Sequence, residues 1–259
     1  MCGRYVEVQK VEVIEKRFNV KADPEFAFEA NYNIGPGTMA PVITSDKPLQ
    51  LQLFRFGMTP FWAKKPMYLF NARSEGDKNK ENDPKYIGSK EIFKKPSFRK
   101  AIRSQRCLVP ADAFIEGTTK EKLSKPYVVY LKDRERPFAF AGIWDTWVNT
   151  ETGEIINSFA IITTTANSLL QKLPHHRSPV ILDRDDEKFW LDSELPLGDA
   201  LELLRPYPSD AMNAYPIAPD IKNPRAEGRA LIEPIGERLT PEYEAKFWIE
   251  LELQGMKRR

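Results

Sequence analysis

The stretch P-F-A-F-A-G-I-W at residues 137–144 is followed, after a polar interval, by N-S-F-A-I-I-T at residues 157–163. Both runs are short, apolar and rich in Phe and Ile, which is typical of buried strands. Four further runs have the same character, at 49–56, 106–109, 127–131 and 180–182. These six segments predict that β-sheet is the basis of the fold.

Helical segments are fewer and shorter, in keeping with 21 prolines spread along the chain. Thr165 is the expected N-cap of one helix, and Thr240 before Pro241 is a good start for another. Because strands outnumber helices and do not alternate with them, we expect an α+β domain on a largely antiparallel sheet. The expected helices cover 11–18, 97–103, 166–173, 185–192 and 241–253.

Composition bounds the domain count and the class of protein. The chain has 259 residues, of which 41% are hydrophobic, enough for one sizeable core, so we expect a single domain over 1–259. A net charge of +2 with 29% charged residues argues against a polyelectrolyte, and it neither shows nor excludes nucleic-acid binding. We interpret the polar stretch 76–95 as a surface excursion, and the basic tail 257–259 as a solvated end.

The sequence indicates the cytoplasm by exclusion. Apolar runs do not reach membrane-spanning length, and the start M-C-G-R-Y-V-E-V lacks the hydrophobic region of a signal peptide. The only cysteines are Cys2 and Cys107, which fits a reducing compartment. Cys107 lies in an apolar strand and is expected to be a buried, inert core residue.

Cys2 is the most informative single residue. Removal of Met1 would leave a terminal cysteine with an α-amine of pKa about 7.7–8.0 and a thiol of pKa about 8.5. Such an aminothiol condenses with an aldehyde to an imine, and its sulfur then closes a five-membered thiazolidine, a step favoured by proximity. The ring-opened sugar of an abasic site in DNA is one such aldehyde. An ordinary second residue is the alternative.

Other polar residues supply candidate partners. His175 and His176, the only histidines, precede an apolar run, where they serve either site chemistry or structure. Glu116 ends the apolar run A-D-A-F-I-E. If burial desolvates it, the pKa of its carboxyl is raised and it is suited to proton transfer. The alternative is a solvated glutamate at the end of a strand. In N-A-R-S-E, Asn71 can bind a sugar hydroxyl and Arg73 a phosphate, unless the segment is merely a surface loop.

Taken together, these segments resemble one family, the SRAP domain of abasic-site processing proteins, over nearly the whole chain. A single piece would be weak evidence, whereas many pieces in the same order are specific. They are M-C-G-R-Y at 1–5, Y-N-I-G-P-G at 32–37, F-G-M-T-P-F-W at 56–62, N-A-R-S-E at 71–75, F-R-K-A-I at 98–102, R-C-L-V-P-A-D at 106–112 with Glu116, F-A-G-I-W at 140–144, F-A-I-I-T-T-T-A-N at 159–167, H-H-R-S-P-V-I-L at 175–182 and Y-P-I-A-P-D-I-K-N-P-R at 215–225.

The resemblance implies a single SRAP domain, barrel-like, that senses abasic sites in single-stranded DNA. The reaction it implies is a covalent thiazolidine crosslink through Cys2 after Met1 removal, which shields the lesion. It implies catalytic roles for Cys2 as nucleophile, Asn71 at the product, Glu116 as acid–base and His175 in sugar-ring opening. It implies DNA contacts from Arg4, Arg73 and Arg177 to phosphates, from Asn33 and Pro36 to the nucleotide, and from Trp62 and Thr164 along the cleft.

The expected chemistry needs no metal and no organic cofactor, the two cysteines and two histidines show no recognisable metal-ligand spacing, and a monomer suits a groove open to DNA. The resemblance also implies the autoproteolytic peptidase activity credited to the family. The sequence departs from the family pattern at three positions. Gly117 stands where Trp is usual, Ser178 where Met is favoured and Phe56 where Trp is common. The loss of Trp at 117 is expected to remove a large wall of the site. The stretch 76–95 is expected to be an insertion relative to the family core.

Two other functions remain open at this point. An N-terminal-nucleophile amidohydrolase, such as a glutamine amidotransferase, also begins with Met-Cys-Gly and uses the free amine as base. The expected Asn-Gly pair of its oxyanion hole and its ammonia-consuming domain are missing from the sequence. A non-catalytic DNA-binding module would show salt-sensitive binding without preference for abasic sites.

Overall fold

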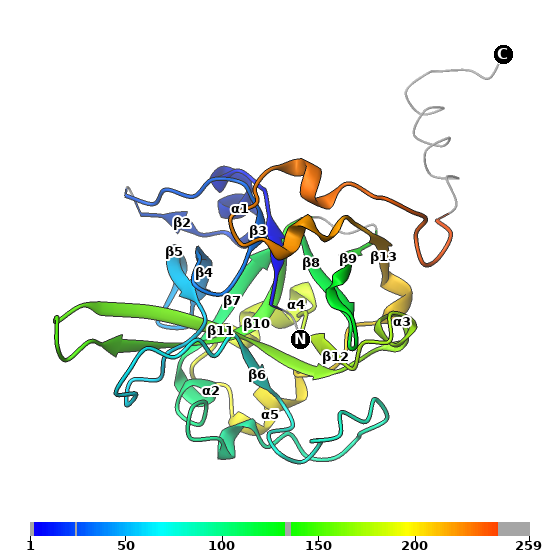
Figure 1. Ribbon diagram of the computed structural model, residues 1–259. Helices are drawn as coiled ribbons and strands as arrows, with labels where there is room; N and C mark the ends of the chain where they lie inside the picture. Colours follow the sequence, from blue (N-terminus) through cyan, green and yellow to red (C-terminus); the bar gives the residue numbers. More distant parts are fainter. Residues whose placement is uncertain (1–2, 24, 133–135, 243–259) are drawn as a thin grey trace.

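The computed structural model describes residues 3–23, 25–132 and 136–242. Its centre is a closed five-stranded barrel (Figure 1). Four antiparallel pairings run round the ring, and a short parallel pairing of Ser158 with Arg55 and of Phe159 with Phe56 closes it. The ring contains, in order, β4 (Met39–Thr44), β5 (Lys47–Phe56), β11 (Ile155–Thr165), β10 (Phe138–Val148) and β7 (Arg106–Ala111).

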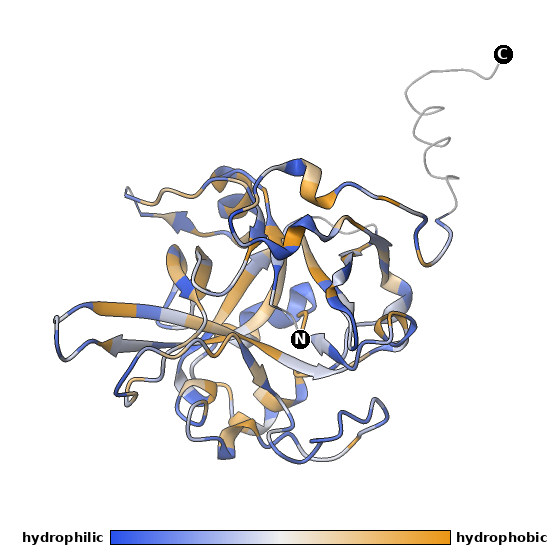
Figure 2. Ribbon diagram, in the orientation of Figure 1, coloured by the Kyte–Doolittle hydropathy of each residue, from blue (hydrophilic) through white to orange (hydrophobic). Residues whose placement is uncertain are grey.

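The stretch F-A-F-A at 138–141 shows why this barrel forms. Phe138 and Phe140 face the barrel interior, where their rings meet edge to face at 5.1 Å. Ala139 and Ala141 alternate with them on the outer face, in a second apolar cluster that includes Trp190. Alternation with period two thus fills the barrel with large rings and leaves small residues where helices pack outside. Figure 2 shows hydrophobic residues along the barrel strands and polar ones in the loops.

A second, antiparallel sheet lies against the barrel. Asp112 alone separates the barrel strand β7 from β8 of this sheet. Tyr5 of this sheet reaches the barrel core, where its ring packs edge to face on Phe56 and Phe140. In order, the sheet contains β13 (Met212–Pro216), β9 (Lys122–Leu131), β8 (Ala113–Thr118), β1 (Tyr5–Glu7) and β3 (Asn31–Ile34), while β2 (Lys21–Ala22) adds to the barrel beside β5.

The end of β11 collects the segments that carry the polar motifs. On one side it pairs in parallel with β6 (Asn71–Arg73), and on the other in antiparallel with β12 (Arg177–Pro179). The chain after β12 runs between β10 and β11. There Val180 N–H donates to the Ile162 carbonyl, and the Val180 carbonyl accepts from Ala141 N–H. The end of β11 therefore carries residues 71–73 on one side and residues 177–179 on the other.

Helices are short and lie at the periphery (Figure 1). The buried Arg106 ties two of them to the barrel, because its guanidinium donates to the carbonyls of Trp190 and Ile102. The helices are α1 (Val11–Phe18), α2 (Ala101–Ser104), α3 (Ser168–Lys172), α4 (Arg184–Leu191) and α5 (Leu197–Glu202), with 3₁₀ turns at Ile92–Lys94, Ser209–Ala211, Pro219–Lys222 and Arg229–Ile232.

The α+β fold class and five of the six expected strands are confirmed. The strand expected at 180–182 is wrong, because Arg177–Pro179 forms the ladder and 180–182 adds only single contacts to β10 and β11. The expected cap Thr165 is also wrong, since the Asn167 side chain accepts from Leu170 N–H. Of the helix expected at 241–253, Pro241 and Glu242 are not helical, and the remainder lies outside the described residues.

The stretch 76–95 consists of turns and one 3₁₀ turn, with Ile87 fully exposed at its tip. Buried Asn79 holds it in shape by bonding both backbone groups of Asp83. This agrees with a surface excursion, and its status as an insertion stays a prediction.

Candidate functional site

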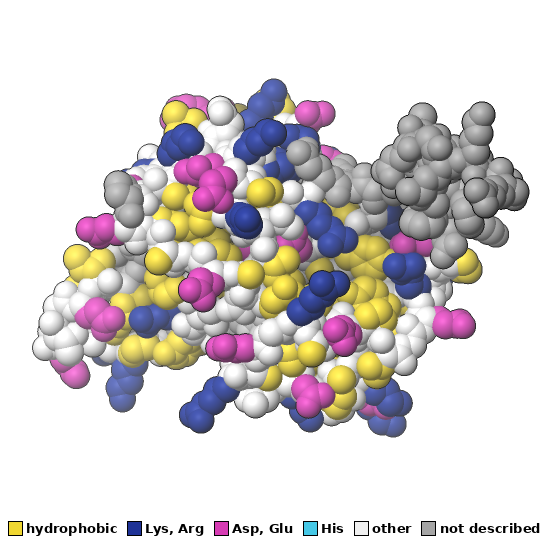
Figure 3. Space-filling view, turned by 90° about the horizontal axis from the view of Figure 1, so that it is seen from above, with side chains coloured by type: hydrophobic (Ala, Val, Ile, Leu, Met, Phe, Trp, Pro, Cys, Tyr) yellow, Lys and Arg dark blue, Asp and Glu magenta, His cyan; other side chains and the backbone are white. Residues whose placement is uncertain are grey.

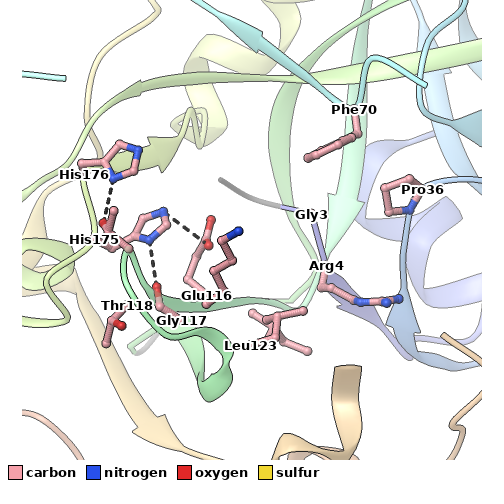
Figure 4. Close-up of a pocket in the computed structure, with 13 residues that line it drawn as sticks. Gly3, Arg4, Pro36, Phe70, Glu116, Gly117, Thr118, Leu123, His175 and His176 are labelled. Carbon is pink, nitrogen blue, oxygen red and sulfur yellow. Dashed lines mark hydrogen bonds and ion pairs between the residues drawn. The ribbon is translucent and has the colours of Figure 1, made fainter. Parts of the chain in front are cut away.

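A cavity of about 430 Å³ lies where β1, the β8–β9 hairpin and the start of β12 meet (Figure 4). The pairing register of β1 with β8 explains why Gly3 and Glu116 both line this cavity. Tyr5 pairs with Phe114, and Ile115 N–H donates to the Arg4 carbonyl, so continuing the ladder places Gly3 opposite Glu116. The residues that line the cavity include Gly3, Arg4, Pro36, Phe70, Glu116, His175 and His176.

Glu116 and His175 form the polar centre of the cavity. Each is at most 5% exposed, and Glu116 Oε2 lies 3.4 Å from His175 Nε2. His175 Nδ1 lies 2.8 Å from the Gly117 carbonyl, which can only accept, so Nδ1 carries the proton. Neutral His175 therefore presents the lone pair of Nε2 to the Glu116 carboxyl (Figure 4).

Burial sets the protonation of this pair. Desolvation raises the pKa of Glu116 to about 7 and lowers the pKa of His175 to about 3. At neutral pH the imidazole is uncharged, and the carboxyl is present in both of its forms. Of the two alternatives left open by the sequence, Glu116 is therefore the desolvated carboxyl and not a solvated one at a strand end. A carboxyl poised near neutral pH is suited to giving and taking protons.

Arg4 supplies positive charge at the edge of the cavity. Its Nη2 donates to the Lys222 carbonyl at 3.4 Å, and burial lowers the pKa of the guanidinium without removing its charge. Gly35 permits this placement, because a Cβ there would lie 2.4 Å from Arg4 Nη1. Pro36, the next residue, is exposed and also lines the cavity.

The structure explains why residue 117 is a glycine, which the sequence alone did not. A Cβ at this position would lie 1.7 Å from the Lys122 carbonyl oxygen, so only glycine allows the β8–β9 hairpin to close here. Lys122 and Leu123 of the hairpin line the cavity beside Gly117, and the loss of a wall relative to the family stays a prediction.

Asn71 and Arg73 lie on β6, beside a neighbouring hollow of about 330 Å³. Phe70, the residue before Asn71, lines the main cavity (Figure 4). Asn71 Nδ2 donates to the Phe70 carbonyl at 3.0 Å, and Arg73 Nη1 donates to the Asn79 carbonyl at 3.3 Å. The structure thus brings β6 to the border of the site, and Asn71 and Arg73 line the neighbouring hollow.

Two residues that were expected to contact DNA, Arg177 and Asn33, are buried and form hydrogen bonds within the protein. Arg177 is 1% exposed, and both its terminal nitrogens bond Glu75, at 3.1 and 2.8 Å. Asn33 is buried, and its amide donates to the carbonyls of Asn223 and Ala226. A phosphate could reach Arg177 only by displacing Glu75, so this geometry favours a structural role for Arg177 and for Asn33.

The remaining expected residues are dispersed. Trp62 is 48% exposed, next to the equally exposed Phe61, on a loop that does not line the cavity. Thr164 is buried on β11 and borders a different hollow, of about 470 Å³, beside residues 86–93. Cys2 lies outside the described residues. Sequence reasoning missed Phe70, Lys122 and Leu123, and only the Gly after Glu116 hinted at a tight hairpin.

Among the described residues no group of three or more His, Cys, Asp or Glu side chains could hold a metal ion. No helix in the same part of the chain is long and apolar enough to cross a membrane. On the face shown in Figure 3, Lys and Arg are interspersed with Asp and Glu, in keeping with the net charge of +2. Local cations such as Arg4 at the cavity therefore matter more for attracting an anion than the overall charge.

Fold and site together define a single α+β domain of one known family. The family model for SRAP, SOS response associated peptidase, matches residues 1–224, and the chain belongs to this family.

Named relatives make the likeness more specific. The chain is 34% identical to abasic site processing protein YoqW of Bacillus subtilis, over 90% of this chain and 99% of the relative. It is 28% identical to abasic site processing protein HMCES of Gallus gallus, over 91% and 78%. A crystal structure of a protein from Bacteroides thetaiotaomicron superposes with a TM-score of 0.76 at 29% identity, covering 91% of this chain and all of that one.

Proposed function

We propose that this protein recognises abasic sites in single-stranded DNA and links itself to them covalently through Cys2, once Met1 is removed. The observation that carries the proposal is the buried Glu116–His175 pair in a cavity that Gly3, the neighbour of Cys2 in sequence, helps to line. The named relatives, which are abasic site processing proteins, support the same substrate.

The size and charge of the cavity suit a sugar without a base. A volume of about 430 Å³ accommodates a deoxyribose and part of a flanking nucleotide, and Arg4 offers a cation to a phosphate. Arg73 adds a second cation on the neighbouring strand β6. Exposed Trp62 offers a surface on which flanking bases can stack without sequence preference.

The chemistry proceeds in three steps. First, the C1′–O4′ bond of the cyclic sugar breaks while the proton of the C1′ hydroxyl moves to O4′, with neutral His175 and Glu116 relaying it. Next, the Cys2 amine adds to the C1′ aldehyde, and the adduct loses one water to give an imine, with protonated Glu116 as the acid. Finally, the Cys2 sulfur bonds C1′ and its proton passes to nitrogen, which closes the thiazolidine.

The test is to incubate the purified protein with a single-stranded oligonucleotide carrying one abasic site. A heat-stable adduct is expected, with a mass equal to protein lacking Met1 plus DNA minus one water. The same strand with an intact base serves as control and should give no adduct. Absence of an adduct with protein shown by mass spectrometry to lack Met1 would refute the proposal.

Removal of Met1 is proposed to use the same machinery. Attack of the Cys2 thiol on the carbonyl of residue 1, with Glu116 accepting the thiol proton, would break the amide bond between residues 1 and 2 and leave the methionyl group on sulfur. Glu116 would pass that proton to the released Cys2 nitrogen, and water would then hydrolyse the thioester and release methionine. This accounts for the word peptidase in the family description without a separate protease site.

Glu116→Gln is expected to slow crosslinking by about 10²–10⁴-fold, because a group that transfers protons in several steps is lost. The wild-type rate should show an inflection near pH 7, where the Glu116 carboxyl titrates, and the variant should lack it. Single-turnover gel assays across pH 5–9 measure both effects. An inflection that persists in Glu116→Gln would assign it to another group.

The free energy of unfolding shows whether Glu116→Gln slows the reaction by removing the carboxyl or by unfolding the protein. Burial raises the pKa of Glu116 from 4.5 to about 7, so its ionisation costs the folded state stability as pH rises through that window, up to about 3 kcal/mol. Glu116→Gln should therefore be more stable than wild type at pH 8 but not at pH 4, as urea unfolding would show.

A further inference from the structure

His176 lines the same cavity as Glu116 and His175, but it has no role in the three proposed steps of crosslinking. Its ring stacks on that of His175, with centroids 5.3 Å apart and planes 18° apart. His175 is 5% exposed, whereas His176 is partly exposed, so a substrate in the cavity can reach it.

Hydrogen bonds fix which nitrogen of His176 carries the proton. Thr119 Oγ1 lies 2.8 Å from the Pro174 carbonyl, which can only accept, so the single hydroxyl proton of Thr119 is used there. The 2.7 Å contact between Thr119 Oγ1 and His176 Nδ1 is then a bond donated by Nδ1. Neutral His176 therefore keeps a lone pair on Nε2, the nitrogen not engaged with Thr119 (Figure 4).

The surroundings keep His176 uncharged. Burial, together with the positive charges of Arg177 and Arg73, lowers the pKa of His176. Its nearest titratable neighbour, His175, is also neutral. A neutral Nε2 accepts hydrogen bonds and cannot donate one to a phosphate oxygen. The ligand group it suits is a hydroxyl.

We propose that His176 is a further substrate-binding residue, whose Nε2 accepts a hydrogen bond from a hydroxyl of the ring-opened abasic sugar, and that Thr119 positions its ring. The inference rests on the proposed function. Ring opening converts O4′ into a hydroxyl, so this bond becomes available only in the open form. His176 then stabilises the aldehyde-bearing sugar for attack by Cys2.

The test compares two measurements on each variant. One is the crosslinking rate at saturating single-stranded DNA with a true abasic site. The other is the Kd for the same strand with a tetrahydrofuran residue, which has no C1′ hydroxyl and cannot open. His176→Asn keeps a donor near Thr119 but lacks Nε2, while Thr119→Val removes the anchor and Thr119→Ser restores it. Thr146→Val is the matched control, because it loses a 2.7 Å hydroxyl bond to Asn157 on the barrel.

We expect His176→Asn and Thr119→Val to lose about 10-fold in rate, the value of one hydrogen bond, with Kd for the tetrahydrofuran strand within about twofold of wild type. Thr119→Ser and Thr146→Val should match wild type in both. An unchanged rate in His176→Asn would overturn the inference. A Kd that weakens in step with the rate would also overturn it, because His176 would then hold the strand by its phosphate. A wild type that forms no adduct would instead refute the proposed function.

Discussion

Cys2→Ala is expected to form no heat-stable adduct with abasic single-stranded DNA, while Cys107→Ala forms it at the wild-type rate. Without sulfur at residue 2 the reaction stops at the imine, which hydrolyses. Closure by a sulfur on the same residue is an intramolecular step, and losing it should cost at least about 100-fold in adduct yield.

Cys107 is a matched control because it is the only other cysteine and lies in the barrel core. Burial raises the pKa of its thiol, so it supplies no thiolate at neutral pH. Borohydride should trap the imine of Cys2→Ala, which shows that the amine still reacts. Denaturing gels measure each product. A heat-stable adduct in Cys2→Ala would assign the crosslink to a different nucleophile.

Arg177→Met should destabilise the fold by about 3–5 kcal/mol, because it leaves the Glu75 carboxylate buried without its cation. Glu75 is 2% exposed, and the two side chains share two hydrogen bonds. The pair joins the chain after β6 to β12, so the loss should also loosen the site. Urea unfolding gives the free energy.

Lys95→Met is the control for a surface ion pair. Lys95 bonds Asp77 at 2.9 Å, but both side chains are solvated, and such pairs contribute about 0–1 kcal/mol. The double variant Arg177→Met with Glu75→Met should recover most of the loss, since no charge remains buried. Equal costs for Arg177→Met and Lys95→Met would contradict a buried structural pair.

Strands with strong apolar patterns could be predicted from sequence, and weakly patterned ones could not. The runs at 138–143 and 157–163 lie within β10 and β11. The short β1 and β6 carry polar residues and owe their strand form to pairing with β8 and β11, which only the folded chain provides. Local periodicity cannot report such contacts.

The residues of the candidate site also divide into those that could be predicted from sequence and those that could not. Glu116 and His175 were singled out, and the structure brings Glu116 of β8 together with His175, which precedes β12 and lies 59 residues further along the chain. Arg177 was expected to meet phosphate because sequence shows a charge but not its partner, and Glu75 lies 102 residues away. Their assigned roles in catalysis and DNA contact stay predictions.

The way residues 180–182 are held between β10 and β11 has a consequence for the motions of the protein. Val180 donates its amide to the Ile162 carbonyl of β11 and Leu182 to the Ala139 carbonyl of the neighbouring strand β10, so these amides exchange with deuterium only when the segment leaves both strands. We therefore expect slow exchange at Val180 and Leu182, which hold the segment that follows His175, and faster exchange around the exposed Ile87.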